Sequence, residues 1–415
     1  MRAALPAGEH VLNDCTDRYR FAVAFAACVV AKKVSLLPST HTLELIRRLA
    51  QLTPDVFCVT DDPRCEIDLP RVYFPDTGAI EHGSWSVPQI EGDQLCAHVF
   101  TSGSTGDPLP HRKTWGRLVS CVTHESRALG LQAGGYAIVG TVPAQHMYGF
   151  ESTVLLALHT RNPLTAARPF YPADIASALA AAPRPRVLVS TPVHLRALLG
   201  ADVPLPAVDA VVSATAPLSM ELAREVEARL TAPLLEIYGS TETGQIASRR
   251  TTQSPQWTLF EGVQLTERDG RMWARGGHIE QPTPLCDVIE IRSATQFLLH
   301  GRLGDLVNIA GKRSSLGYLE SQLNALPGVL DGAFFLREEG TRSSVEVTRV
   351  GAMVVAPGLD GRAILEQLRK RIDPVFLPRP LLFVDRLPRN GTGKLSREAL
   401  HSLLNTTKRP SAKEA

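Results

Sequence analysis

The sequence lacks the features that mark disulfide-rich and zinc-binding proteins. Its seven cysteines are odd in number and widely scattered, and they form no C-x-x-C pair. This pattern is typical of thiols in a reducing compartment and predicts neither a disulfide framework nor a zinc site. The twelve histidines include no H-E-x-x-H motif and no clustered His/Cys ligand set, which also argues against zinc.

Long hydrophobic runs are also missing. The longest apolar run, Phe21 to Ala31, is eleven residues and is closed by Lys32 and Lys33. Eleven residues cannot cross a bilayer, so a buried helix is the better interpretation. Acidic residues precede the run and no small-residue cleavage site follows it, unlike a secretory signal. We therefore expect a cytoplasmic protein with no membrane span.

The charge shows no excess of one sign. Forty-four basic and 42 acidic residues give a net charge of +2, so there is no general reason to expect nucleic acid as a partner. Hydrophobic residues make up 44% of the 415 residues, which is ordinary for a globular protein. That length exceeds what one core usually supports, so we expect two or more domains.

The first 300 residues alternate short apolar runs with helical stretches. The predicted strands are Asp55–Thr60, Gly135–Val142, Arg186–Ser190 and Ala207–Ser213, and the predicted helices include Leu43–Leu52, Asp174–Ala182 and Ser219–Arg229. This alternation predicts an α/β layered architecture with a largely parallel sheet. Polar, turn-broken strands over Trp257–Trp273, with a hairpin at Asp269–Gly270, indicate a smaller β subdomain.

A second unit of α+β composition is predicted after Gly301. Its expected elements are helices at Ser315–Ala325 and Gly361–Ile372, and strands at Gly332–Leu336, Val350–Val355 and Leu381–Val384. About 110 residues suffice for a small second domain.

The strongest motif is a glycine- and hydroxyl-rich run after an apolar strand end. Its residues are Thr101, Ser102, Gly103, Ser104, Thr105 and Gly106. Glycines let backbone N–H groups approach an anion, and the hydroxyls add donors, as a polyphosphate requires. The run fails the Walker A spacing. Taken alone, it is also compatible with a flexible turn.

Two further motifs carry chemistry. Tyr238, Gly239, Ser240, Thr241 and Glu242 combine an aromatic ring, a glycine, two hydroxyls and a carboxylate. Such a run can stack a base, hydrogen-bond a phosphate and hold Mg²⁺ through Glu242. Near the C-terminus, Lys394 follows the glycine-rich run 391–393. Taken alone, the run 238–242 is also compatible with a strand-end turn that carries a solvated glutamate. Lys394, taken alone, is also compatible with an exposed surface lysine.

Together and in this order, the three motifs resemble the adenylate-forming superfamily of acyl-CoA synthetases, peptide-synthetase adenylation domains and firefly-type luciferases. The resemblance makes Thr101–Gly106 the phosphate loop, Tyr238–Glu242 the adenine-and-magnesium motif and Lys394 the catalytic lysine. It also makes Asp287 the ribose ligand ahead of the Gly301–Arg302 pair, and places the segment Thr215, Ala216 and Pro217 beside the adenine. Thr101, Glu242 and Lys394 are the predicted catalytic residues, and Arg302 is grouped with the nucleotide-binding ones.

The resemblance implies a large N-terminal adenylation domain over residues 1–302 and a small, mobile C-terminal lid over residues 303–415. The chain departs from the family at two points. The phosphate loop continues with Leu109 and Pro110 where the family has Lys-Gly, and the nearest lysine is Lys113. The hinge position holds Gly304 where the family has Asp or Lys, and glycine tolerates more backbone conformations there.

The acyl pocket is assigned by the same resemblance to His146, Met147 and Gly149. Members that activate amino acids carry an Asp at the position of Met147, to pair with the substrate ammonium. A methionine offers no charge partner, and an unpaired buried ammonium is costly, so amino acids are disfavoured. His146 is compatible both with lining an aromatic pocket and with a hydrogen-bonded structural role.

The amino-acid sequence around these motifs resembles that of the ligases of aryl-polyene and xanthomonadin pigment clusters. This implies ATP- and Mg²⁺-dependent activation of an aromatic acid, hydroxybenzoate- or cinnamate-like, and its transfer to the phosphopantetheine thiol of an acyl carrier protein. A free CoA ligase is the nearer alternative, since only the acceptor differs. A non-catalytic nucleotide-binding protein of the same fold is the remoter one.

Overall fold

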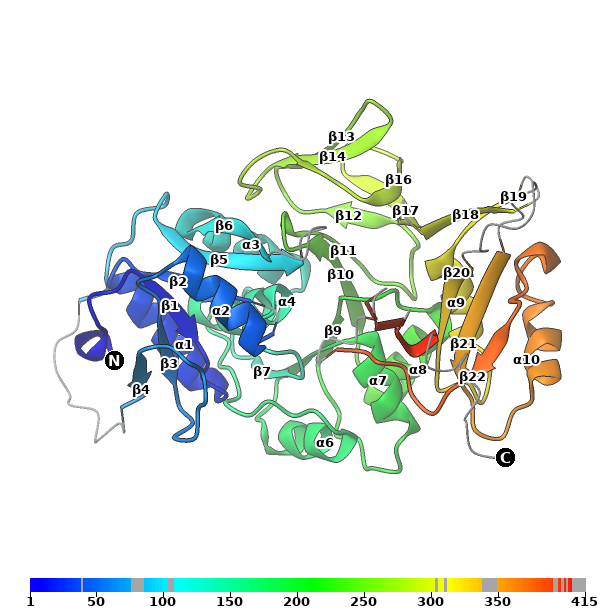
Figure 1. The fold of residues 1–415 in the computed structure, drawn as a ribbon, viewed down its shortest axis with the longest axis horizontal. Coiled ribbons are helices and arrows are strands. Elements are labelled where there is room, and N and C mark those ends of the chain that lie inside the picture. Colours follow the sequence, from blue (N-terminus) through cyan, green and yellow to red (C-terminus); the bar gives the residue numbers. More distant parts are fainter. Residues whose placement is uncertain are drawn as a thin grey trace, which may run out of the picture.

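The structure, a computed structural model, describes residues 1–38, 40–75, 86–102, 108–302, 305–309, 312–337, 349–390, 395–396, 399–400 and 402–404. Sheets and helices alternate along the chain, which confirms the predicted α/β class. Figure 1 shows the N-terminal sheet at one end, a central body, and the C-terminal elements at the other end. Among the described residues, no helix combines the length and apolarity that crossing a membrane requires.

The N-terminal sheet has six strands in the order β4-β3-β1-β2-β5-β6. Its strands are β1 (His10–Asn13), β2 (Val34–Leu37), β3 (Phe57–Thr60), β4 (Arg71–Tyr73), β5 (Leu95–Ser102) and β6 (Pro108–Thr114). The first five run parallel, and β6 turns back antiparallel to β5. The helices in this part of the chain are η1 (Arg2–Ala4), α1 (Arg18–Val30), α2 (Leu43–Leu52) and α3 (Trp115–Ala128).

Helix α1 confirms the buried helix predicted from the apolar run. The carboxylate of Asp17 accepts a hydrogen bond from the backbone N–H of Arg20 at 2.9 Å, which caps the helix. Phe21 and Phe25 are at most 1% exposed and pack into the sheet's core. The helix also carries the buried Arg18, whose guanidinium donates to the carbonyls of Gly140 and Val142 at 2.8 and 2.9 Å. This side chain ties the first sheet to the second.

The central sheet has eight strands in the order β16-β17-β12-β11-β10-β9-β8-β7. They are β7 (Ala137–Gly140), β8 (Arg186–Ser190), β9 (Ala210–Ser213), β10 (Leu234–Ser240), β11 (Gly244–Arg249), β12 (Trp257–Leu259), β16 (Asp287–Ile291) and β17 (Gln296–Arg302). The strands β7 to β10 are parallel, as predicted. From β10 onward the neighbours are antiparallel, so only half of this sheet fits the expectation of a largely parallel one.

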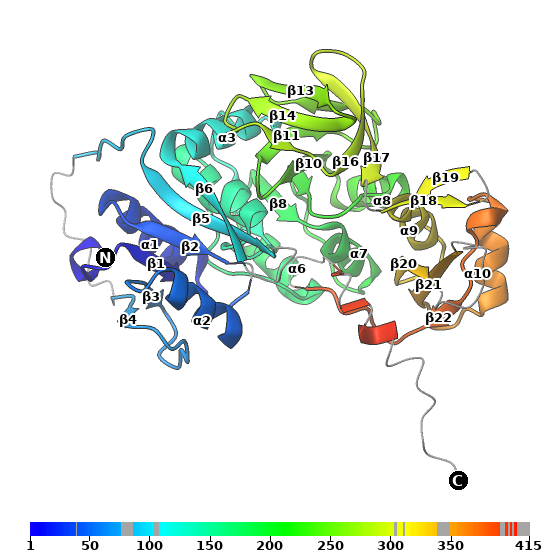
Figure 2. The ribbon, with the colours of Figure 1, turned by 45° about the horizontal axis from the view of Figure 1, so that its top comes forward.

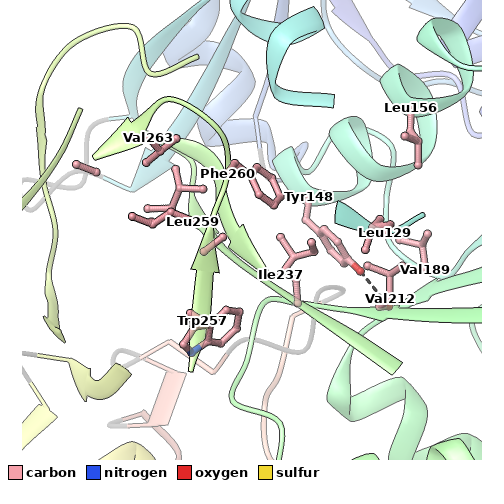
Figure 3. Packing of buried hydrophobic residues seen from close by; sticks show 14 of the residues in the cluster. Leu129, Tyr148, Leu156, Val189, Val212, Ile237, Trp257, Leu259, Phe260 and Val263 are labelled. Carbon is pink, nitrogen blue, oxygen red and sulfur yellow. Dashed lines mark hydrogen bonds between the residues drawn. The ribbon is translucent and has the colours of Figure 1, made fainter. Parts of the chain in front are cut away.

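Helices connect the parallel strands of the central sheet. They are α4 (Met147–Gly149), the π-helix η2 (Phe150–Leu155), α5 (Leu156–His159), α6 (Pro172–Ala181), α7 (Pro192–Gly200) and α8 (Met220–Leu230). The predicted strands and helices of this region are confirmed, with ends shifted by a few residues. Figure 3 shows the core at this level, where the hydroxyl of Tyr148 donates to the carbonyl of Val212 at 3.1 Å. Ile237 and Trp257 complete the same cluster.

The predicted β subdomain is a three-stranded sheet of β13 (Val263–Arg268), β14 (Arg271–Gly276) and β15 (Thr283–Pro284), but its expected first strand from Trp257 belongs to the central sheet as β12. The hairpin at Asp269–Gly270 is confirmed, with positive φ angles of 51° and 70° at its two central residues. Two consecutive positive φ angles define the turn that suits a tight hairpin's twist. Figure 2, turned to bring the top forward, shows this sheet above β10 and β11.

The C-terminal elements form two small sheets with helices; the helices α9 and α10 and the strands β20, β21 and β22 were predicted, whereas the hairpin of β18 and β19 was not. They are β18 (Leu306–Ile309), β19 (Lys312–Ser315), α9 (Leu316–Asn324), β20 (Asp331–Arg337), β21 (Arg349–Val355), α10 (Gly361–Leu368), η4 (Pro374–Phe376) and β22 (Leu381–Phe383). Their buried apolar residues form clusters of their own. Arg371 lies 3.7 Å from Glu221 of α8, which brings the two parts of the chain into contact.

Candidate active site

Thr101, the first residue of the predicted phosphate loop, lies close to Glu242 of the predicted magnesium motif. Thr101 lies near the end of β5, and its hydroxyl shares a 2.8 Å hydrogen bond with Nε2 of His111 on β6. The same imidazole nitrogen is 3.8 Å from Oε1 of Glu242, in the turn between β10 and β11. His111 therefore links two predicted catalytic residues that are 141 positions apart in the sequence.

The carboxylate of Glu242 is held ionised at this place. Burial favours its neutral form. The Ser240 hydroxyl, its own backbone N–H and the positive fields of His111 and Lys113 outweigh that effect and lower its pKa. Its side chain is 38% exposed. An ionised, accessible carboxylate is the ligand that Mg²⁺ takes in proteins, so Glu242 fits the metal role that the sequence suggested.

The turn that carries Glu242 needs glycine at both ends. A Cβ on Gly239 would lie 2.3 Å from the carbonyl oxygen of Gly244, so no other residue fits. Gly244 has a φ of +72°, and a Cβ there would lie 2.8 Å from Oε1 of Glu151. Inside the turn, the Ser240 and Thr243 hydroxyls are 3.2 Å apart and exchange hydrogen bonds with each other's backbone N–H. The turn is therefore a packed and hydrogen-bonded structure.

Tyr238 and Asp287, the predicted adenine and ribose residues, are joined directly. The Tyr238 hydroxyl donates to Oδ2 of Asp287 at 2.8 Å. The Tyr238 ring lies 5.6 Å from both Trp257 and Phe297, centroid to centroid. Asp287 is also paired across the strands β16 and β17 with Arg302. Tyr238 and Asp287 thus form one aromatic and acidic face from β10 and β16, and the Tyr238 ring packs on the buried rings of Trp257 and Phe297.

The segment Thr215–Pro217 follows β9, the parallel neighbour of β10. Thr215 has a φ of 81°, which costs energy for a β-branched residue and is typical of functional sites. Ala216 is half-buried and Pro217 is exposed. The carboxyl ends of adjacent parallel strands lie at one edge of a sheet, so this segment lies beside Tyr238.

The predicted acyl residues lie where β7 leads into the helices α4 and η2. His146 is half-buried and occupies the residue before α4, without a capping hydrogen bond from its side chain. Met147 is 5% exposed and packs into the core cluster that also holds Phe25 and Phe150. A Cβ on Gly149 would lie 2.0 Å from the carbonyl oxygen of Pro143, so this position also requires glycine.

A buried charged set that the sequence did not reveal lies behind the turn. Lys113 is 4% exposed, and its ammonium donates to the carbonyl oxygen of Glu242 at 3.2 Å. Burial lowers the pKa of Lys113, while the negative fields of Glu151, Cys121 and Glu280 oppose that shift. Burial raises the pKa of Glu151 to about 7, and the field of Lys113 opposes it. Lys113 therefore supports the turn from behind.

Cys121 completes this support. Its thiol donates to Oε1 of Glu151 at 3.1 Å, and the Gln245 amide donates to the Ser152 hydroxyl at 2.9 Å. Because Glu151 and Ser152 belong to η2, these contacts connect the acyl segment to the strand after the turn. The only sequence signal for this set was Glu151, a carboxylate in the mainly apolar run 147–156.

Several predicted site residues fall outside the described part of the chain. These are Gly103, Ser104, Thr105 and Gly106 of the phosphate loop, the hinge Gly304 and Lys394; for Ser102 and Arg302 only the backbone is described, in β5 and β17. Their roles stay predictions. The described residues Thr101, Tyr238, Gly239, Ser240, Thr241, Glu242 and Asp287 come from β5, β10, the following turn and β16.

Comparison with known proteins shows which family the chain resembles. Residues 4–319 match the family model described as AMP-binding enzyme. The 4-coumarate–CoA ligase of Rhodobacter capsulatus is 34% identical over 298 residues, which cover 71% of this chain and 73% of that protein. The 4-chlorobenzoate–CoA ligase of an Arthrobacter species is 26% identical over 352 residues, 74% of this chain and 65% of that protein.

Solved structures agree on the fold. ATP-bound MatB from Rhodopseudomonas palustris superposes with a TM-score of 0.79 at 20% identity, covering 98% of this chain and 90% of that one. The o-succinylbenzoate CoA synthetase of Bacillus subtilis, in complex with its acyl-adenylate, gives 0.77 at 17% identity, over 96% and 89%.

The chain belongs to the AMP-binding enzyme family. This confirms the predicted superfamily, its fold and its class, an AMP-forming acid–thiol ligase. The relatives reported above by sequence both carry the name of CoA ligases that act on aromatic acids.

Proposed function

We propose that this enzyme activates an aromatic carboxylic acid, hydroxybenzoate- or cinnamate-like, as its acyl-adenylate and transfers the acyl group to a phosphopantetheine thiol. The observation that carries the adenylation half is the convergence of Thr101, Glu242, Tyr238 and Asp287 at neighbouring strand ends. An aromatic and acidic face for a nucleoside adjoins an ionised carboxylate and a hydroxyl-rich strand end, which is the set that MgATP requires.

In the proposed first step, a carboxylate oxygen of the acid attacks the α-phosphorus of ATP in line. The new acyl–phosphate bond forms as the bond to the bridging oxygen of pyrophosphate breaks, and pyrophosphate leaves. Mg²⁺ bound at Glu242 would neutralise phosphate charge during this step. Positioning and preorganised charge supply most of the catalysis in such chemistry, and we assign the bridge between carboxylate and α-phosphate to Lys394.

The choice of an aromatic acid is supported by the acyl segment. Met147 is buried in an apolar cluster and has no charge to offer a substrate ammonium, and an unpaired ammonium there would be costly. The two relatives named for aromatic substrates, 4-coumarate and 4-chlorobenzoate, point in the same direction. Amino acids are therefore poor candidates.

For the second step we propose the phosphopantetheine of an acyl carrier protein as acceptor. The thiol loses its proton to solvent and attacks the acyl carbon to form the thioester, and AMP leaves with the pair of electrons from the bond between the acyl carbon and the phosphate oxygen. Residues 303–415 would form a lid that turns about Gly304 and withdraws Lys394 between the two steps. Free CoA presents the same phosphopantetheine arm, and the names of the relatives favour it as the second candidate.

The test is thioester formation with each acceptor. The full-length enzyme is incubated with MgATP, one acid from a panel of hydroxybenzoates and hydroxycinnamates, and either CoA or a holo-carrier protein, and the products are weighed by mass spectrometry. The proposal expects an acyl-carrier thioester from an aromatic acid. If a thioester forms with CoA and not with the carrier protein, CoA is the acceptor. If thioesters form only from fatty acids or amino acids, the assignment of an aromatic substrate is wrong.

A further inference from the structure

A second polar cluster lies in the N-terminal sheet, apart from the candidate active site. The ligand atoms of Asp14, Cys58 and Cys65 all lie within 4.8 Å of one another. Asp14 follows β1, Cys58 lies within β3, and Cys65 belongs to the loop that leaves β3. Since β1 and β3 are parallel neighbours, their carboxyl ends lie together and bring these three side chains into one place.

The distance between the Cys65 and Asp14 ligand atoms suits a tetrahedral metal ion. The Cys65 sulfur is 3.4 Å from Oδ2 of Asp14. Zinc binds sulfur at about 2.3 Å and carboxylate oxygen at about 2.0 Å, so two such ligands at a tetrahedral angle lie about 3.5 Å apart. Two thiolates and a carboxylate form a three-ligand set that leaves a fourth position open. Cys58 is fully buried and Cys65 is 8% exposed, while the Asp14 side chain is 22% exposed, which gives an ion a path in.

Surrounding contacts hold Asp14 and the Cys65 loop in place. Oδ1 of Asp14 is 2.7 Å from Nδ1 of His41, so its other oxygen faces Cys65 and the Thr60 hydroxyl. A hydrogen-bonded second partner of this kind orients metal-binding carboxylates and histidines. The Cys65 loop is fixed as well: its N–H donates to the Asp62 carbonyl at 3.1 Å, and the guanidinium of Arg71 donates to the Cys65 carbonyl.

We propose that Asp14, Cys58 and Cys65 bind a thiophilic divalent cation, Zn²⁺ first, with His41 orienting the carboxylate. The ion would join the end of β1 to β3 and to the loop 61–70, and so stabilise the sheet on which β5 and the phosphate loop are built. Binding would displace both thiol protons to solvent, because the thiolate is the form that ligates. This site is independent of the proposed ligase activity. It revises the expectation, drawn from the scattered cysteines, that no zinc site exists.

Zinc content of the full-length protein tests the proposal. All variants carry Cys286→Ser, because Cys286 is an exposed thiol that would collect metal by itself. After dialysis against Zn²⁺ and gel filtration, the parent should hold about one zinc per chain, and Cys58→Ser with Cys65→Ser should hold less than about a tenth. Cys96→Ser is the matched control, a buried thiol of the same sheet outside the cluster, and should keep its zinc. His41→Ala should weaken zinc affinity by roughly 10- to 100-fold.

Two measurements on the parent protein keep the test valid if the cysteine variants fail to fold. Co²⁺ in place of zinc should give the near-ultraviolet sulfur-to-cobalt absorption that only thiolate ligands produce. A strong chelator should lower the Tm, and added Zn²⁺ should restore it. Three results would each overturn the proposal. The parent protein could contain no zinc, the variant that lacks both cysteines could still contain zinc, or the protein with bound Co²⁺ could show no sulfur-to-cobalt absorption band. A Cys58–Cys65 disulfide in the isolated protein would also overturn the proposal, because the two cysteines would then be a redox pair and not metal ligands.

Discussion

The two sides of the turn between β10 and β11 are built in opposite ways. The front set, Tyr238, Glu242 and Asp287, is partly exposed and comes from strand ends of one sheet. The back set, Lys113, Cys121 and Glu151, is buried and comes from β6, α3 and η2. The front set offers charge and hydrogen bonds to a ligand. In the back set, the Lys113 ammonium instead donates a hydrogen bond to the Glu242 carbonyl within the turn. The difference suggests that substrate contact and turn geometry are controlled by separate residues.

The largest expected effect is at the front. Replacing Glu242 by Gln removes the ionised carboxylate without changing its size, so adenylation should fall by about 10²- to 10³-fold. Stability should change little, because the side chain is 38% exposed. ATP–pyrophosphate exchange and thermal melting measure the two quantities. Glu261→Gln, at a carboxylate that is 76% exposed, serves as control. Full exchange activity in Glu242→Gln would remove this residue from the chemistry.

The next effect is at the back. Lys113→Met keeps the length of the side chain but removes the donor to the Glu242 carbonyl, which should lower the free energy of unfolding by about 1–3 kcal/mol. Adenylation should fall as well, because the turn loses its support. Urea unfolding and exchange assays check both, with the exposed Lys370→Met as control. If Lys113→Met behaves like Lys370→Met in both assays, the back set has no role in positioning the turn.

The pH dependence of stability separates the two sets further. Burial raises the pKa of Glu151 from 4.5 to about 7, so the folded protein holds this proton more tightly than the unfolded chain. Its stabilising contribution is full below the unfolded pKa and is lost as the pH rises through the folded pKa. Glu151→Gln should therefore flatten the fall in Tm between about pH 5 and pH 8. An unchanged pH profile would show that Glu151 does not titrate in this range.

The smallest effect belongs to the nucleotide face. Tyr238→Phe keeps the ring but removes the hydrogen bond to Asp287, worth about 0.5–1.5 kcal/mol. We expect the KM for ATP to rise roughly 2- to 10-fold while kcat is kept. Steady-state kinetics at varied ATP measures the split. A loss in kcat with unchanged KM would mean that the Tyr238 hydroxyl acts on the reacting atoms. Tyr238 would then have a role in catalysis and not only in nucleotide binding.

This contrast also explains what the sequence could predict. Front residues lie in runs such as Tyr238–Glu242, where local order carries the chemistry, and the class of fold followed from the alternation of strands and helices. Lys113, Glu151 and the cluster at Asp14 depend on contacts between distant segments, which no linear spacing reveals. The antiparallel half of the central sheet was also missed, because the segment from Trp257 was expected to belong to the separate β subdomain, whereas β12 pairs with β11 and β17.

The most direct test of the central claim is ATP–pyrophosphate exchange by the full-length enzyme across hydroxybenzoates, hydroxycinnamates, fatty acids and amino acids. We expect exchange that depends on one aromatic acid, falls by about 10²- to 10³-fold in Glu242→Gln and is absent with every amino acid. Exchange driven by an amino acid would contradict the acyl-pocket assignment at Met147. No exchange with any acid, from folded protein that still binds ATP, would contradict the assignment of an adenylating enzyme.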